Sequence, residues 1–271
     1  MICDNCSHNC DLKEGQSGLC HARSNKGDTI VCDNYGSVTS LALDPIEKKP
    51  LAMFHPGSFI LSTGSYGCNM SCPWCQNDSI SRGYVEADKL TPEELVDIAI
   101  DTKKRGNIGI AYTYNEPFVG YEFVYDSARL AKKSGLVNVC VSNGMLERGR
   151  FDELAGYIDA YNIDLKTGYA EKYEKIGGDL ELITGNITSA VKKGRHVELT
   201  TLVVPRFNDS DDDIERIVAF ISEIDTKIPL HITRFFPAGK MRDERPTELD
   251  ILYRFRDIAS KKLENVFLGN V

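Results

Sequence analysis

The interpretation of this sequence begins with Gly67-Cys68-Asn69-Met70-Ser71-Cys72-Pro73-Trp74-Cys75-Gln76-Asn77. Its three cysteines are spaced Cys-x3-Cys-x2-Cys, so three thiolates can face one side of a compact inorganic cluster. The next cysteines along the chain are Cys32 and Cys140, so no fourth one is near. An electron-carrying 4Fe–4S centre takes four cysteines, so three would leave one iron open to a substrate or cofactor. Structural zinc also needs four ligands, and His55 is the only nearby candidate, which makes zinc the weaker interpretation.

On both sides of the cysteine loop, short β-branched runs alternate with amphipathic segments from residue 58 onward. This alternation predicts a parallel sheet, and six units predict an α/β fold with a partial (β/α)6 barrel. The chemistry of such a fold gathers at the carboxyl ends of its strands. The expected strands are 58–63, 108–112, 137–141, 160–165, 197–203 and 229–233. The expected helices are 92–104, 120–134, 150–156, 186–194, 210–224 and 247–262.

Composition limits the possible functions. The chain has 271 residues, of which 42% are hydrophobic, which is enough for one sizeable core. A net charge of −8 argues against a broad nucleic-acid surface. No apolar run is long enough to span a membrane, and the start Met1-Ile2-Cys3-Asp4-Asn5 lacks a signal-peptide pattern, so we expect a cytoplasmic protein. Nine cysteines in a reducing compartment then point to metal binding or catalysis.

The first 57 residues are expected to form a separate Cys-rich module, with the barrel at 58–271. The module has few apolar runs, so a metal on Cys3, Cys6, Cys10 and Cys20 would take the place of a core. Zinc and a second iron–sulfur cluster both fit, with a slight preference for zinc, because the spacing matches neither a paired zinc knuckle nor a ferredoxin. The segment 44–50 is expected to be an extended connection, since residues before proline avoid the helical region.

The Cys-x3-Cys-x-aromatic-Cys pattern, with Trp74 as the aromatic residue, resembles the signature of the radical S-adenosylmethionine (SAM) superfamily. The resemblance implies that Cys68, Cys72 and Cys75 hold a 4Fe–4S cluster whose open iron binds the amino and carboxylate groups of SAM. An electron from a donor such as flavodoxin or ferredoxin would then cleave the S–C5′ bond and produce a 5′-deoxyadenosyl radical.

Polar residues follow the next three expected strands. Glu116 resembles the glutamate of the superfamily's Gly-Gly-Glu element, which receives the SAM amino group, although Tyr114 and Asn115 replace the glycines. Asn115 is a further candidate for this contact. The stretch Ser142-Asn143-Gly144 is either a simple turn or a contact to SAM. The pair Asp164 and Lys166 resembles the Asp-x-Lys of pyruvate formate-lyase activating enzymes, near the SAM carboxylate.

The last two expected strands carry the remaining cofactor-binding candidates. These are Thr200 on the fifth strand and His231 and Arg234 on the sixth, and Trp74 of the cysteine loop is a further candidate. Val204 and Pro205 are expected to shape the adenine pocket. His231 is equally compatible with a purely structural role.

Nearly the whole chain resembles the AmmeMemoRadiSam family, which is related to pyruvate formate-lyase activating enzymes. The resemblance rests on the Cys-rich start and on 34–36, 44–51, 68–77, 113–117, 163–166 and 267–270. It implies hydrogen abstraction from a protein, such as from a backbone glycine. The family name reflects association with Memo-like and AMMECR-like proteins, which are therefore candidate partners. Many relatives continue into a further cysteine pair, so a chain ending at Val271 is expected to be a short or trimmed form.

Two alternatives remain at this point. One is a radical SAM enzyme that modifies a small molecule or RNA, although the acidic chain disfavours RNA. The other is an iron–sulfur electron carrier or metal-binding adaptor that never cleaves SAM. Glu116, Asp164 and Lys166 at successive strand ends argue against a carrier, which needs no SAM pocket.

Overall fold

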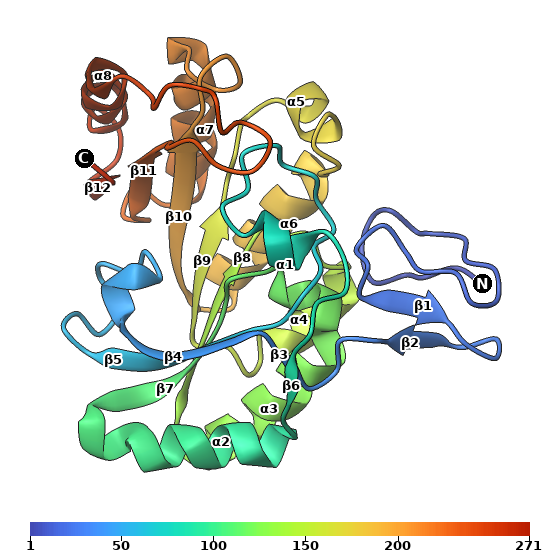
Figure 1. Cartoon of the computed structure of the whole chain (residues 1–271). Helices are drawn as coiled ribbons and strands as arrows, with labels where there is room; N and C mark the ends of the chain where they lie inside the picture. The colour runs from blue at the N-terminus through green and yellow to red at the C-terminus, as the bar shows by residue number, and fades with distance from the viewer.

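The computed structural model describes all 271 residues and is built around one curved sheet of eight strands (Figure 1). The strand order is β12-β11-β10-β9-β8-β7-β5-β4, and every neighbouring pair is parallel except β4 with β5. The α/β fold with a partial barrel is therefore confirmed. The strands are β4 (Ser40–Pro45), β5 (Phe59–Gly64), β7 (Asn107–Tyr112), β8 (Val137–Ser142), β9 (Ala160–Asp164), β10 (His196–Val203), β11 (Leu230–Arg234) and β12 (Val266–Gly269).

Helices cover the outer side of the curved sheet (Figure 1). Their starts follow the sequence: Thr91 and Glu94 form a capping box, and Ser210 accepts from the backbone N–H of Asp213. The long helices are α2 (Pro92–Asp101), α3 (Tyr121–Lys133), α4 (Arg148–Leu154), α6 (Leu180–Lys192), α7 (Asp211–Ile224) and α8 (Leu249–Ala259). The short helical segments are α1 (Asp78–Ser81), α5 (Ala170–Glu174), η1 (Ile46–Lys48), η2 (Thr102–Arg105) and η3 (Pro117–Gly120).

Two apolar cores lie on the two faces of the sheet. The larger, of 46 buried residues, fills the space between the sheet and the outer helices. The smaller lies inside the curve and contains Ile46, Leu51, Ile60, Ala111, Val139 and Ala160. Ala111 is paired with Val139, and Val139 with Ala160, so one layer of inward-facing side chains is continuous across the strands. Ile46 and Leu51 close the barrel against this layer and form its floor.

The N-terminal residues lie beside the barrel, where the hairpin of β1 (Arg23–Asn25) and β2 (Ile30–Cys32) projects from it (Figure 1). Arg23 pairs with Glu122 of α3 at 2.6 Å, which ties this hairpin to the barrel. The short strands β3 (Ser37–Val38) and β6 (Asp88–Lys89) pair with each other. Residues 40–45, which lie within the expected N-terminal module, form β4 of the large sheet. A domain boundary after residue 57 stays a prediction.

The structure also corrects details of the sequence-based expectation. The sheet has two edge strands, β4 and β12, in addition to the six that the sequence predicted. Pairing with strands elsewhere in the chain forms them, and the local sequence pattern does not reveal such pairing. The segment 44–50 is not wholly extended, since Pro45 precedes the 3-10 turn η1. Helix α6 begins at Leu180 because Asp179 caps it, six residues before the expected start. No helix combines the length and apolar character needed to cross a lipid bilayer.

Candidate functional site

The cysteine loop joins the carboxyl end of β5 to α1, and several contacts fix its backbone. Arg82 donates to the carbonyl oxygens of Cys72 at 2.7 Å and Met70 at 3.3 Å. A Cβ added to Gly239 would lie 2.6 Å from the carbonyl oxygen of Pro73, so the segment after β11 packs directly on the loop. Contacts from two other segments of the chain therefore fix the shape of the loop.

The thiols of Cys68, Cys72 and Cys75 are half-buried, unpaired with other cysteines and close enough to influence one another. Burial raises the pKa of Cys68, and the charges of Glu116, Cys72 and Cys75 raise it further. The backbone N–H of Met70 and the amide of Asn143 approach the sulfur of Cys68 at 3.4 and 3.9 Å. Such N–H groups stabilise negative charge on cluster sulfurs, so the donor set suits an iron–sulfur cluster.

Glu116 is a buried carboxylate at the carboxyl end of β7. It accepts hydrogen bonds from the hydroxyl of Ser142 at 2.8 Å and from the backbone N–H groups of Asn143 at 2.7 Å and Phe118 at 3.0 Å. Burial raises the pKa of Glu116 to about 7, although these three bonds oppose the shift. Ser142 and Asn143 thus orient Glu116, and all three lie beside Cys68.

Asp164 and Lys166 lie at and just beyond the carboxyl end of β9. The Lys166 ammonium is 2.9 Å from the Asp164 carboxylate. Burial lowers the pKa of Lys166, but the charges of Asp164 and Cys72 raise it above its ordinary value. A partly buried cation therefore lies beside Cys72, while the buried carboxylate of Glu116 lies beside Cys68.

Asn115 has structural hydrogen bonds, and its contact to SAM stays a prediction. Its side-chain oxygen accepts from the backbone N–H of Ser65 at 2.8 Å, and its amide donates to the carbonyls of Tyr66 and Gly67, both at 3.1 Å. These residues immediately precede Cys68. Asn115 therefore holds the start of the cysteine loop.

Four other predicted residues have protein partners of their own. Trp74 is buried against Phe207, with ring centroids 4.5 Å apart. Arg234 donates to the carbonyl of Thr247 at 2.7 Å. Thr200 pairs in register with Asp164, and its hydroxyl donates to Asn162 at 2.9 Å. His231 lies near the amino end of β11.

His231 belongs to a separate buried cluster around Glu198. The Glu198 side chain is fully buried, and the Nε2 atoms of His231 and His196 lie 2.6 and 2.8 Å from its two oxygens. The backbone N–H groups of Ala52 and Met53 complete its hydrogen bonding. Sequence reasoning missed Glu198, because its partners come from three separate segments. Arg82 was also missed, since nothing in the pattern marks it.

The four N-terminal cysteines are brought together beside the cysteine loop. Burial raises the pKa of Cys6 to about 11, and the charges of Cys20 and Cys10 add to the shift. The charges of Cys3 and Cys10 likewise raise the pKa of Cys20, although burial is the larger cause. No group of three or more His, Cys, Asp or Glu side chains has an arrangement that would hold a metal ion. The loop cysteines likewise form no site for a single metal ion, which differs from the four-iron cluster that their spacing suits.

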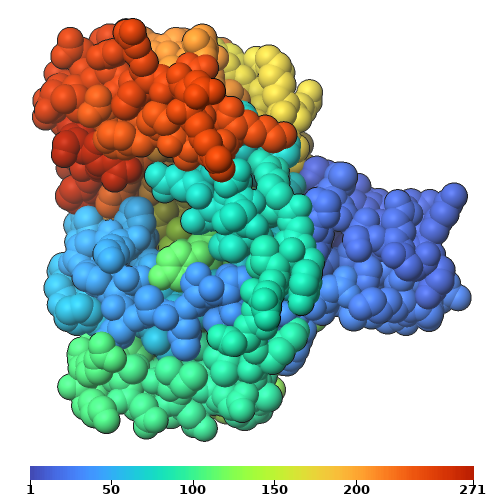
Figure 2. Space-filling model, in the orientation of Figure 1, coloured from blue at the N-terminus to red at the C-terminus, as the bar shows by residue number.

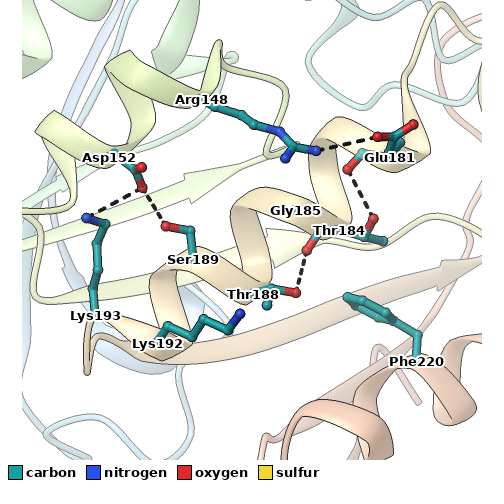
Figure 3. A pocket seen from close by; sticks show the side chains of 10 residues that line it. All are labelled: Arg148, Asp152, Glu181, Thr184, Gly185, Thr188, Ser189, Lys192, Lys193 and Phe220. Atoms are coloured by element: carbon teal, nitrogen blue, oxygen red, sulfur yellow. Dashed lines mark hydrogen bonds and ion pairs between the residues drawn. The ribbon is translucent and has the colours of Figure 1, made fainter.

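A surface hollow of about 550 Å³ lies elsewhere (Figure 3). It runs between α4 and α6 toward α7, and Figure 3 shows Arg148 facing Glu181 and Asp152 facing Lys193 and Ser189. Only Phe220 in its lining is apolar. A second hollow opens on the barrel side, between the blue segment near residue 50, the teal segment after the cysteine loop and the orange C-terminal part (Figure 2). Glu116, Asp164 and Lys166 follow strands of the barrel and do not line the hollow of Figure 3.

A three-cysteine loop at the carboxyl ends of a parallel, partly closed barrel defines a class of enzyme. The family model described as the radical SAM superfamily matches residues 63–221, and the chain belongs to that superfamily. It is therefore an enzyme of a family that uses SAM, a 4Fe–4S cluster and an electron donor, and it is related to activating enzymes. Membership in this family argues against the electron carrier or adaptor considered above.

Particular relatives refine this placement. An uncharacterized protein of Methanocaldococcus jannaschii is 41% identical over 99% of this chain and 81% of its own length. The 4-hydroxyphenylacetate decarboxylase activating enzyme of Clostridioides difficile is 28% identical over 73% of this chain and 67% of its own. Among solved structures, a radical SAM methyltransferase from Sphaerobacter thermophilus shares the fold with a TM-score of 0.61 at 16% identity, over 80% of this chain and 67% of its own.

Proposed function

We propose that Cys68, Cys72 and Cys75 hold the 4Fe–4S cluster and that SAM binds between Glu116 and Lys166. One observation carries the proposal: a buried carboxylate lies beside Cys68 and a partly buried ammonium lies beside Cys72 of the same loop. The methionine end of SAM carries an ammonium and a carboxylate, and each suits the opposite charge in the protein. Three thiols without a fourth leave the open position that this binding needs.

When bound, the reduced cluster supplies the electron that cleaves SAM to methionine and a 5′-deoxyadenosyl radical. The chain's own residues position the reactants. Glu116, fixed by Ser142 and Asn143, receives the SAM ammonium, and Lys166, fixed by Asp164, receives its carboxylate. Asn143 also places its amide near the sulfur of Cys68. Thr200, Arg234, Trp74 and His231 remain candidates for further cofactor contacts.

We propose that the radical acts on a protein, by abstracting hydrogen from a backbone glycine or a related position. The support is the similarity to relatives named as activating enzymes, including the 4-hydroxyphenylacetate decarboxylase activating enzyme. A flavodoxin or ferredoxin would supply the electron. Memo-like and AMMECR-like proteins are the candidate partners, and a small-molecule substrate is the second candidate.

A second metal site on Cys3, Cys6, Cys10 and Cys20 is also proposed, holding zinc or another iron–sulfur cluster. Its support is the mutual proximity of four thiols in a segment that contributes only Cys20 and Ala22 to a three-residue apolar cluster. Metal analysis distinguishes the alternatives. Zinc, or iron beyond four per chain, should fall in Cys6→Ser but not in Cys32→Ser, whose thiol lies outside both groups.

The decisive experiment is anaerobic. Protein reconstituted with iron and sulfide is reduced with dithionite and given SAM, and 5′-deoxyadenosine is quantified. We expect product with the unmodified protein and with Cys32→Ala, and none with Cys72→Ala. Absence of SAM binding to protein with an intact cluster would refute the assignment. Deuterium transfer from a labelled candidate protein into 5′-deoxyadenosine would identify the substrate class.

A further inference from the structure

Tyr114 has an unusual backbone. Its φ of 72° lies in the left-handed region, which a residue with a side chain rarely occupies and glycine occupies freely. The residue lies two positions before Glu116 and two positions after the end of β7. A non-glycine residue there needs an opposing gain, because this conformation costs free energy.

The Tyr114 side chain is fastened at both its hydroxyl and its ring. The hydroxyl donates to the carboxylate of Asp44 at 2.8 Å, and the ammonium of Lys49 lies 4.7 Å from the ring centroid. A Cβ added to Gly64 would lie only 2.8 Å from atoms of the Tyr114 side chain, so the ring also packs tightly against β5. These contacts stabilise the left-handed backbone.

The two charged partners are themselves held in the barrel floor. Lys49 is only 3% exposed, and its ammonium is 2.9 Å from Asp44. Asp44 belongs to β4, while Lys49 follows η1 and lies between the fully buried Ile46 and Leu51. The position of Tyr114 is therefore determined by contacts with the barrel floor, which is formed by a segment that precedes the cysteine loop in sequence.

The backbone around Tyr114 reaches both ends of the cysteine loop. The amide of Asn77, at the end of the loop, donates to the carbonyl of Tyr114 at 2.7 Å. Asn115 holds residues 65–67 at its start. A shift of Tyr114 would therefore be transmitted to the cysteines and to Glu116 together.

We propose that Asp44 and Lys49 are positioning residues for the SAM site, acting through Tyr114. They compensate for the left-handed backbone that places Glu116 and the two ends of the cysteine loop. The inference rests on the proposed SAM site. It also explains how a tyrosine can occupy a position where the Gly-Gly-Glu element has glycine. In this chain the contacts of the tyrosine side chain with the barrel floor stabilise the left-handed backbone.

The first test compares Asp44→Asn and Lys49→Met with Lys48→Met. Lys48 also pairs with Asp44, at 3.3 Å, but its side chain is 66% exposed, so it serves as the matched control. We expect the first two variants to raise KM for SAM about tenfold, with kcat at saturating SAM within about twofold, whereas Lys48→Met changes neither. Hydrogen exchange in residues 113–118 without SAM should be faster in the first two variants only. Unchanged exchange and KM in both would overturn the proposal.

A second test uses glycine at position 114. Tyr114→Gly adopts the same backbone without strain, so adding Asp44→Asn to it should change the SAM Kd less than twofold, against about tenfold in the unmodified background. An equal effect of Asp44→Asn in both backgrounds would mean that Asp44 does not act through Tyr114, and the inference would fall. Failure of the unmodified protein to bind SAM would instead remove the proposed function and this inference with it. Hydrogen exchange would still report whether the side chain fastens the loop.

Discussion

The backbone N–H of Cys68 donates a hydrogen bond to the carbonyl oxygen of Cys20 at 3.2 Å. A second contact lies beside it, where Nε2 of His8 is 2.7 Å from the carbonyl of Asn69. The segment with the four N-terminal cysteines therefore supports the loop with the three cluster cysteines. A change in the conformation of the N-terminal segment is therefore expected to shift the cysteine loop through these contacts, and the reverse.

Substitution of Gly67 tests the contact between these two segments. A Cβ there would lie 2.6 Å from the Cys20 carbonyl oxygen and 2.8 Å from the Cβ of Ala22, at a φ of 92°. We expect Gly67→Ala to cost about 2–4 kcal/mol in the free energy of unfolding, because backbone strain and overlap add. Gly57→Ala is the control, since Gly57 also has a positive φ but nothing within 4 Å, and should cost about 1 kcal/mol. Urea denaturation measures both, and equal losses would contradict the close packing.

Lys166 tests the carboxylate side of the proposed SAM site. Lys166→Met keeps the aliphatic stem but removes the ammonium, and should raise the SAM Kd roughly tenfold to a hundredfold, since hydrogen bonds to charged groups are worth about 1.5–3 kcal/mol. Lys175→Met, at an exposed lysine after α5, should leave it unchanged. Equilibrium dialysis with reconstituted protein gives both values. An unaltered Kd in Lys166→Met would place the carboxylate elsewhere.

Glu198 gives a pH-dependent prediction. Burial would raise its pKa, but hydrogen bonds from His196, His231 and the backbone lower it from 4.5 to about 2. A carboxylate with a lowered folded-state pKa stabilises the protein above pH 4.5, and this contribution, about 3 kcal/mol, is lost as the pH falls toward 2. Glu198→Gln should lack it.

The measurement is urea denaturation of Glu198→Gln and unmodified protein at pH 7 and pH 3. We expect the stability difference to be about 2 kcal/mol smaller at pH 3, because the unfolded-state glutamate is then largely protonated. Glu47→Gln is the comparison, since the Glu47 carboxylate is an exposed acceptor for the backbone N–H of Gly57. A difference independent of pH would show that folding does not lower the pKa of Glu198.

Local sequence features predicted much of this fold. Six β-branched runs became the six inner parallel strands, and Thr91 and Ser210 begin helices as expected. These features depend on residues close together in the chain, where side-chain shape and capping bonds act directly. The spacing of Cys68, Cys72 and Cys75 likewise places three thiols on one loop whatever surrounds it.

The contacts between distant segments required the tertiary structure. Tyr114 meets Asp44, 70 positions away, and Glu198 meets Ala52, 146 positions away. Such pairs depend on the register of β4 against β5 and of β10 against β11, which is set by packing over the whole sheet. The local sequence from Asp44 to Leu51 does not indicate that the side chain of Lys49 points into the barrel. That direction is decided because Ile46 and Leu51 must be buried against Ile60, Ala111 and Val139 in the barrel floor.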